Sequence, residues 1–239
     1  SPFDYEAVDI LEALDVPFYK IASPEIVDLE LIYYIANKQK PVIISTGMSN
    51  LEEIEDALKT ILKSGNNKIV ILHCNTLYPT PLEAVNLKAI KTLEETFEYP
   101  IGFSDHTKEI YFSVAAVAMG ACIIERHFTL DHDMPGFDHK ASLDPKQFKE
   151  MVKQIREIEK AKGRFKKRPV NGEKTSIENM RRSIVAKFDI AEDTTITEDM
   201  LILKRPGTGL SAKYFDFVIG RKPKKLIYKD TVILTSHLK

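Results

Sequence analysis

Two histidines with acidic neighbours could together bind a metal ion. His106 follows Asp105, His127 lies two residues after Glu125, and a short apolar stretch precedes each pair. If the two stretches are adjacent parallel strands, about 4.8 Å apart, both imidazoles can reach one ion at roughly 2.0–2.2 Å. The two carboxylates could then orient the imidazoles. The alternative is that each histidine is a polar strand end that makes an ordinary hydrogen bond.

A second group of polar residues follows the ends of apolar stretches and suits a small anion. Its cationic, hydroxyl and amide side chains can all donate hydrogen bonds to a phosphate or a carboxylate. The group consists of Lys20, Ser23, Ser45, Thr46, Asn75 and Ser104. Helix capping is a competing explanation for Ser45 and Thr46. Glu25 is a candidate for proton transfer, although a helix N-terminus also favours a carboxylate electrostatically.

The segment 131–140 is dense in charge, with three Asp, two His and one Lys. Solvated surface charge is the usual explanation of such a run. The segment directly follows the last apolar stretch, however, and Pro135-Gly136 shapes it, so a loop that contacts substrate is at least as good an interpretation.

Five short apolar segments predict buried parallel strands, because each is rich in β-branched or aromatic residues and carries charge only at or next to an end. They are 17–21, 41–45, 68–73, 100–104 and 121–126. Helical patterns lie between and after them, at 4–14, 51–63, 82–94, 107–119 and 144–161. The stretch Ser49-Asn50-Leu51-Glu52-Glu53 supplies an N-cap and an acidic first turn for the second helix, and Gly65 fits the position just after its end.

Alternation of strands and helices predicts right-handed βαβ units around a parallel sheet. An open doubly wound sheet and part of a (β/α)8 TIM barrel both satisfy this pattern. The polar residues follow all five strands, and only a barrel brings five strand ends to one mouth. No Gly-rich dinucleotide loop follows the first strand. We therefore predict a partial TIM barrel over residues 1–162, with about five of its eight strands.

The remaining residues have a different character. Residues 163–182 are predicted to form an exposed linker rich in Gly, Lys and Arg. Residues 183–239 contain short alternating apolar pieces separated by turn residues, and they predict a small β-rich domain. Residues 181–239 carry 12 Lys and Arg against 7 Asp and Glu. This basic module could bind nucleic acid, or it could equally present cations to an anionic substrate bound elsewhere. It contains no RNA-binding aromatic motif, and we expect no nucleic-acid partner.

Composition bounds the class of protein. Of the 239 residues, 44% are hydrophobic and 29% charged, which is typical of a globular protein. The apolar stretches are far too short to cross a membrane, and the first residues show no charged-then-apolar leader pattern, so we expect a cytoplasmic protein. Cys74 and Cys122 lie in predicted strands and are expected to be buried, reduced thiols.

Seven motifs, in order and spacing, resemble the sialic acid synthase family, whose C-terminal domain is the antifreeze-like (SAF) module. The resemblance covers essentially the whole chain. The motifs are Lys20-Ile21-Ala22-Ser23-Pro24-Glu25, Ser45-Thr46-Gly47-Met48, His73-Cys74-Asn75-Thr76-Leu77-Tyr78-Pro79, Gly102-Phe103-Ser104-Asp105-His106-Thr107, Glu125-Arg126-His127-Phe128-Thr129, Asp138-His139-Lys140-Ala141-Ser142-Leu143 and Lys204-Arg205-Pro206-Gly207.

The resemblance implies a transferase that condenses phosphoenolpyruvate with N-acetylmannosamine or a related diacetamido hexose. His106 and His127 would bind Mn2+ or another divalent cation such as Mg2+, with Glu25 near the reacting atoms. The residues implied to hold phosphoenolpyruvate are Lys20, Ser23, Ser45, Asn75 and Ser104. Tyr78 and Asp138 would contact the sugar. The family is a domain-swapped homodimer, so Arg205 is expected to reach the partner's active site and hold the N-acyl group.

This chain also departs from the family. About a hundred residues, with three barrel strands, precede the corresponding segment in the family, so we expect the chain alone to be unstable or inactive. The Asn75-Thr76 order differs from the usual one. Residues 138–142 are more similar to neuraminate and legionaminate synthases than to pseudaminate synthases. Two alternatives remain: another metal-dependent ulosonate synthase that uses phosphoenolpyruvate, and a non-catalytic carbohydrate-binding fragment.

Overall fold

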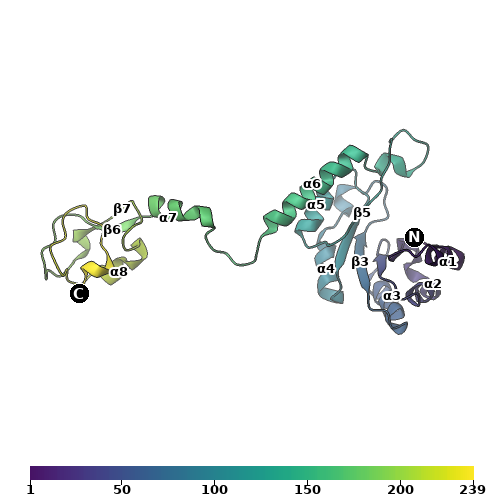
Figure 1. Ribbon diagram of the computed structural model, residues 1–239, viewed down its shortest axis with the longest axis horizontal. Helices are drawn as coiled ribbons and strands as arrows, with labels where there is room; N and C mark the ends of the chain where they lie inside the picture. Colours follow the sequence, from purple (N-terminus) through teal and green to yellow (C-terminus); the bar gives the residue numbers. More distant parts are fainter. The chain divides into compact units, whose positions relative to one another are not determined.

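The computed structural model describes residues 1–239, which divide into two compact units, residues 1–163 and 164–239. A five-stranded sheet lies in the first unit and a two-stranded sheet in the second. Figure 1 shows both units with their elements labelled. No helix in the structure combines the length and the apolar character needed to cross a membrane.

The sheet of the first unit is entirely parallel, and its strands pair in sequence order. It curls into a half-barrel, which confirms the predicted five strands of a partial TIM barrel. The strands are β1 (Tyr19–Ile21), β2 (Val42–Ser45), β3 (Ile69–Cys74), β4 (Ile101–Asp105) and β5 (Ile124–Arg126). Because all five run in one direction, their carboxyl ends lie along a single edge of the sheet.

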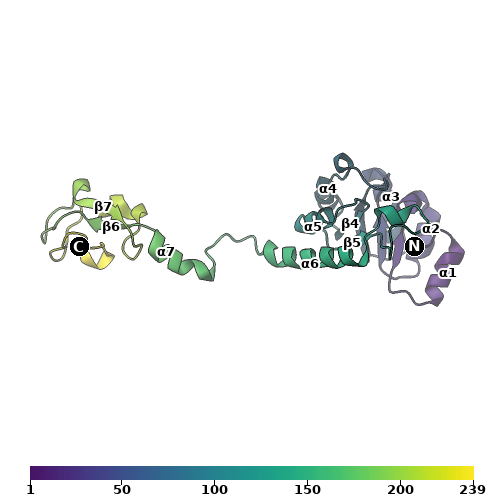
Figure 2. The same ribbon diagram turned by 90° about the horizontal axis from the view of Figure 1, so that it is seen from above.

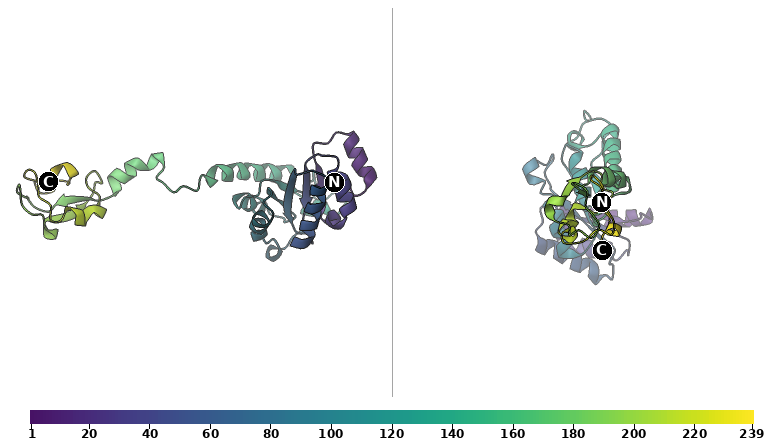
Figure 3. Two further views of the ribbon diagram at one scale, coloured as in Figure 1. Left: turned by 90° about the horizontal axis from the view of Figure 1, so that it is seen from below. Right: turned by 90° about the vertical axis from the view of Figure 1, so that its left-hand side faces the viewer.

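Helices alternate with the strands and lie outside the sheet, as Figures 1 and 2 show. The α-helices of this unit are α1 (Tyr5–Ala13), α2 (Leu29–Ala36), α3 (Leu51–Lys63), α4 (Lys88–Phe97), α5 (Tyr111–Ala118) and α6 (Pro145–Lys162). Three 3-10 turns, η1 (Ser23–Val27), η2 (Leu82–Ala84) and η3 (Asp138–Ala141), follow β1, β3 and β5. Figure 3 shows α6 as one uninterrupted helix at the C-terminal end of this unit.

Helix α3 shows how local sequence sets these boundaries. The Asn50 side chain accepts a hydrogen bond from the Glu53 backbone N–H at 3.0 Å, and the Glu53 carboxylate accepts one from the Asn50 N–H at 2.8 Å. This reciprocal capping box satisfies N–H groups that have no partner within the helix. Gly65, with a φ of +80°, follows the end of the helix. Both predicted boundaries are confirmed.

Several predicted elements were wrong in extent. The predicted helix 82–94 is two elements, η2 and α4, because Asn86 between them has a φ of +45°, which no right-handed helix allows. Cys122 is exposed, not buried, since it lies ahead of β5, whereas Cys74 is buried as predicted. Helix α2 was not predicted; its apolar face packs into the main core.

The second unit has its own apolar core under mostly irregular backbone. Its elements are η4 (Asn171–Glu173), α7 (Lys174–Met180), β6 (Ser183–Ala186), η5 (Glu198–Met200), β7 (Leu201–Lys204), η6 (Ala212–Tyr214), α8 (Phe215–Val218) and η7 (Thr235–His237). The core includes Ile184, Ile190, Ile196 and Ile233. Helix α7 lies within the predicted linker, where the Glu178 carbonyl accepts a hydrogen bond from the Gly207 N–H.

Candidate active site

A chain of polar contacts joins three strands at the carboxyl edge of the half-barrel. Ser104 on β4 donates a hydrogen bond of 2.7 Å to Glu125 Oε1 on β5. The second oxygen of Glu125 lies 3.4 Å from Lys20 Nζ on β1. Only 14% of the Lys20 side chain is exposed, so its charge faces Glu125 within the half-barrel and not bulk water. Two predicted anion-binding residues are thus brought together, and Glu125 links them.

His106 and His127 also lie side by side. Their ring centroids are 5.1 Å apart, and Tyr78 stands over both, at 4.2 Å from His106 and 5.6 Å from His127. Nδ1 of His106 lies 2.7 Å from the Asn75 carbonyl oxygen. A carbonyl can only accept a hydrogen bond, so Nδ1 carries the proton and Nε2 keeps its lone pair.

Burial lowers the pKa of both imidazoles below the ordinary value of 6.5. The cause is the cost of placing a charged ring in a poorly solvated site. The neutral ring is the form that binds a metal ion. Nδ1 of His127 faces Asp138 Oδ2 at 3.6 Å, which is longer than a hydrogen bond.

This pair fits a divalent cation that keeps several ligands from outside the protein. The two imidazoles are neutral and adjacent, and His106 Nε2 makes no hydrogen bond. No group of three or more His, Cys, Asp or Glu side chains is arranged to hold a metal. The chain would therefore supply two nitrogen ligands, and water or substrate the others.

The hydroxyl groups of Ser23 and Thr76 lie beside Gly47, just after β2. Ser23 Oγ accepts a hydrogen bond of 3.0 Å from the Gly47 N–H. Ser45 Oγ and Thr76 Oγ1 are buried and have no hydrogen-bond partner. A Cβ atom on Gly47 would collide with Thr76 Oγ1 and lie 2.8 Å from Ser23 Oγ, so these three residues are neighbours. Unpaired buried hydroxyls are costly, which marks this place as one prepared for a polar ligand.

Asn75 contacts His106 through its backbone. Its backbone carbonyl holds His106, and the residue also lines a cavity of about 400 Å³ between α3 and α4, together with Met48 and Asn86. The neighbouring Thr76 is the residue whose side chain meets Ser23 and Gly47. The reversed Asn75-Thr76 order therefore places a hydroxyl, in place of an amide, beside the anion-binding group.

The remaining predicted residues of this unit lie at the rim. Asp138, at the start of η3, is exposed, and Tyr78 is 48% exposed. Burial raises the pKa of Tyr78 above its ordinary value, so its hydroxyl stays protonated near neutrality. Glu25 is half-buried on η1, and its carboxylate makes no hydrogen bond. These three side chains are available to a ligand.

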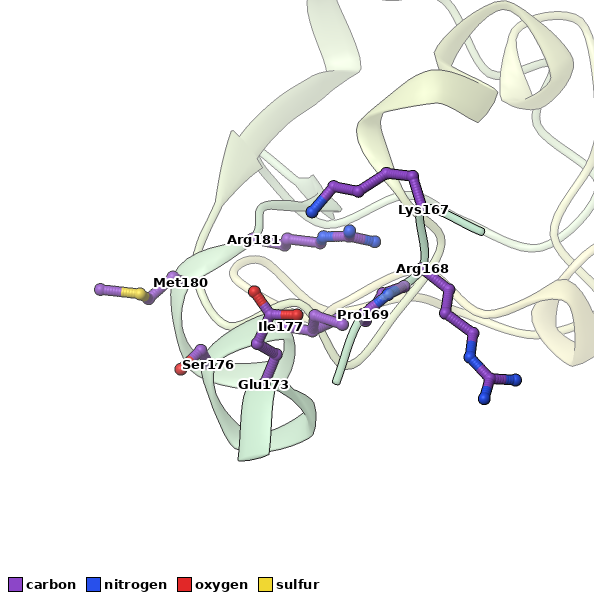
Figure 4. A pocket seen from close by; sticks show the side chains of 8 residues that line it. All are labelled: Lys167, Arg168, Pro169, Glu173, Ser176, Ile177, Met180 and Arg181. Atoms are coloured by element: carbon purple, nitrogen blue, oxygen red, sulfur yellow. The ribbon is translucent and has the colours of Figure 1, made fainter. Parts of the chain in front are cut away.

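Arg205 belongs to the second unit. It is exposed, its Nε donates a hydrogen bond of 2.9 Å to the Met180 carbonyl, and its two terminal nitrogens make no hydrogen bond. Figure 4 shows a pocket of about 440 Å³ in the same unit. Lys167 and Arg181 lie across it, while Arg168 points away. Residues of the predicted linker form this pocket, and it contains none of the predicted site residues.

A buried ion pair lies behind the histidines, on the face of the sheet that packs against the helices. Arg126 Nη1 is 2.8 Å from Asp105 Oδ1, and their side chains are 1% and 0% exposed. Ser113 on α5 donates a hydrogen bond of 2.6 Å to the other Asp105 oxygen. Burial lowers the pKa of Arg126, and the charge of Asp105 opposes that effect.

The sequence prediction did not include two residues of this cluster, Glu125 and Thr76. Glu125 was treated as an aid to the histidines, although its register with Ser104 across β4 and β5 could have indicated direct contact. Thr76 was set aside in favour of Asn75. Its only sequence signal was the unusual Asn75-Thr76 order. That order does not show which of the two side chains faces Gly47.

Comparisons with known proteins agree with this fold. Residues 1–167 match the NeuB family, and residues 181–239 match the SAF domain. The chain belongs to the NeuB family. It is 45% identical to an N,N'-diacetyllegionaminic acid synthase of Campylobacter jejuni over 98% of this chain and 70% of that enzyme. It is therefore an enzyme of the sialic acid synthase type.

Two further NeuB-type proteins extend this comparison. A Legionella pneumophila N,N'-diacetyllegionaminic acid synthase is 39% identical over 99% of this chain and 67% of that enzyme. The crystal structure of a Chromobacterium violaceum protein, described as a putative spore coat polysaccharide biosynthesis protein E, superimposes with a TM-score of 0.83. That match has 29% identity and covers all of this chain and 72% of the other. The NeuB resemblance predicted from the seven motifs is confirmed.

Proposed function

We propose that this enzyme condenses phosphoenolpyruvate with an N-acylated hexosamine aldose to give a nine-carbon acidic sugar and phosphate. The observation that carries the proposal is the convergence at one edge of the sheet. There, the Lys20–Glu125–Ser104 contacts lie at the same strand ends as two neutral imidazoles. The first set suits an anionic substrate, and the second suits a divalent cation. The named synthase relatives support the reaction class.

In this proposal the anion-binding residues hold the phosphate and carboxylate groups of phosphoenolpyruvate. Lys20 supplies positive charge, and the hydroxyls of Ser23, Ser45 and Thr76 supply hydrogen bonds. Glu125 keeps Lys20 and Ser104 in place, so these donors are arranged before the substrate binds. Preorganised donors stabilise charge that develops on oxygen without further rearrangement.

Carbon–carbon bond formation would take place beside the histidines. A divalent cation such as Mn2+, held by His106 and His127, would supply Lewis-acid polarisation of the open-chain aldehyde. C3 of phosphoenolpyruvate attacks the aldehyde carbon, and the former carbonyl oxygen gains a proton to become a hydroxyl. Water adds at C2, and phosphate leaves as the keto group forms. Glu25, half-buried and without a hydrogen bond, would accept a proton from that water.

The sugar would bind at the rim, near Tyr78 and Asp138. N-Acetylmannosamine and a diacetamido hexose are the two acceptors to compare, and the legionaminic acid synthases among the relatives support the second. We also propose a homodimer in which Arg205 holds the N-acyl group in the site of a second copy. The unpaired terminal nitrogens of this exposed arginine support that role. Replacement of Arg205 by Ala should then raise KM for the sugar and leave KM for phosphoenolpyruvate unchanged.

The deciding experiment is phosphate release by the full-length protein with phosphoenolpyruvate, Mn2+ and each of the two sugars, with and without a chelator. We expect release that requires a sugar and stops when the chelator is added. Release with phosphorylated sugars alone would indicate another ulosonate synthase. Sugar binding without any release would favour a non-catalytic carbohydrate-binding protein.

A further inference from the structure

The ion pair of Asp105 and Arg126 occupies a particular place relative to the two histidines. These residues are direct partners across β4 and β5, and each precedes one of the histidines in the chain. Side chains alternate between the two faces along a strand. The contact of Ser104 with Glu125 therefore lies on the inner face, the ion pair on the helix-facing side, and the histidines on the inner face again.

The acidic member of the pair anchors the backbone on both sides of His106. Asp105 Oδ1 accepts a hydrogen bond of 2.9 Å from the Thr107 N–H as well as the ion pair from Arg126. Arg126 Nη1 also donates to Thr107 Oγ1 at 3.2 Å. The carbonyl of His106 itself accepts a hydrogen bond from the Thr80 N–H at 2.9 Å. His106 is thus fixed by several independent contacts.

His127 has fewer anchors. Its carbonyl accepts a hydrogen bond of 2.9 Å from the Leu143 N–H, and its ring makes no hydrogen bond within the chain. Two side-chain contacts tie this strand end to β4: Glu125 with Ser104, and Arg126 with Asp105. Of the two, only the ion pair joins the residues that directly precede His106 and His127.

Stability alone does not account for such a pair. Arg126 Nε and Nη2 are buried and have no hydrogen-bond partner, so part of the desolvation cost of the guanidinium is not recovered. Replacing a buried ion pair by apolar residues of similar volume is often neutral or stabilising. The geometry that the pair imposes is a better explanation. Two opposite charges buried away from water favour the register of β4 and β5 in which they meet.

We infer that Asp105 and Arg126 are positioning residues that set the separation of His106 and His127 and so determine metal affinity. This inference rests on the proposed metal site. The pair touches neither substrate nor metal, because it acts from the opposite face of the sheet through the two peptide bonds that precede the histidines. Removing it should loosen His127 while the Lys20–Glu125–Ser104 contacts stay in place.

The test measures Mn2+ binding to the full-length protein by calorimetry, without substrate. For Arg126→Met we expect affinity to fall by about 10- to 100-fold, the range typical for residues that orient metal ligands. Arg126→Lys should restore part of the loss. Phosphoenolpyruvate affinity should stay within about twofold. Lys40→Met, which removes the ion pairs to Asp15 and Glu12 away from the histidines, is the matched control and should bind Mn2+ normally.

A double variant, Asp105→Leu with Arg126→Met, separates positioning from stability. We expect its Tm to equal or exceed that of the wild type while Mn2+ affinity stays low. Wild-type Mn2+ affinity in this variant would overturn the inference, as would a parallel loss of phosphoenolpyruvate affinity in Arg126→Met. A wild-type protein that binds no Mn2+ would instead overturn the metal assignment of the proposed function, and this inference with it.

Discussion

Charged and hydroxyl side chains are buried at the strand ends of residues 1–163, whereas residues 164–239 keep their ion pairs at the surface. All four buried side-chain atoms without a hydrogen-bond partner lie in the first unit, on Ser45, Thr76 and Arg126. In the second unit Ser183 is the one buried polar residue, and its hydroxyl is fully paired. The ion pairs Lys204–Asp230 and Lys239–Asp193 are exposed there.

This difference separates binding chemistry from structural stabilisation. Unpaired buried polar atoms lower stability and are retained where a ligand can satisfy them. The second unit, by contrast, contains no buried side-chain nitrogen or oxygen without a hydrogen-bond partner. In the proposed function, the second unit would therefore contribute exposed groups such as Arg205, and the first unit groups that it keeps out of water.

The largest expected effect comes from removing a histidine of the first unit. His127→Ala should lower Mn2+ affinity and metal-dependent turnover by more than about 100-fold, since even residues that only orient ligands contribute up to that amount. His237→Ala, in η7 of the second unit, is the matched control and should leave both unchanged. Phosphate release and calorimetry would report the two quantities. Normal activity of His127→Ala without added metal would refute the metal assignment.

A methyl group added at Gly47, beside the hydroxyls of Ser23 and Thr76, should have the next largest effect. Gly47→Ala places a Cβ against Thr76 Oγ1 and Ser23 Oγ, so both hydroxyls must move. We expect a higher KM for phosphoenolpyruvate and a destabilisation of about 1–3 kcal/mol, typical of overpacking. Gly172→Ala in the second unit meets nothing within 4 Å and serves as the control. Equal KM values for the two variants would show that the hydroxyls beside Gly47 do not bind this substrate.

Acid should weaken the first unit more than the second. Burial lowers the pKa of His73 below 6.5, and this ring donates a hydrogen bond to the Val85 carbonyl. The unfolded chain therefore binds a proton at a higher pH than the folded one, so stability is complete above pH 6.5 and falls as the pH drops below it. Urea unfolding of the metal-free protein at pH 7.5 and 5.5 would show this fall.

A substitution at His73 makes that test specific. His73→Gln should reduce the difference in unfolding free energy between the two pH values, because a neutral side chain binds no proton in either state. An unchanged pH dependence in this variant would assign the effect to other groups.

The smallest effect is expected at the surface of the second unit. Asp230→Asn removes the ion pair with Lys204, which holds the pKa of Asp230 below its usual value through a side-chain hydrogen bond. Solvent screens such an exposed pair, so Tm should not change measurably. A clear loss of Tm in a thermal scan would contradict the contrast drawn between the two units.

The sequence by itself determined the five parallel strands, because uninterrupted apolar runs and capped helices are local signals. It also placed His106 and His127 after neighbouring strands, since in-order pairing carries the two strand ends to one edge. The helix boundary at Asn50 followed from a capping box only four residues long. In each case the physical cause lies within one element or its direct neighbour.

The tertiary structure alone decided which side chains meet. Lys20 and Glu125 are far apart in sequence, and only the curl of the sheet brings them together. Whether Asn75 or Thr76 turns inward depends on the path of the loop after β3 and on the space beside Gly47. The exposure of Cys122 could not be predicted, because its N–H donates a hydrogen bond to the Ile101 carbonyl of β4 while its side chain is exposed. Long-range pairing and side-chain direction have no local signal, so the arrangement of the site could be established only from the fold.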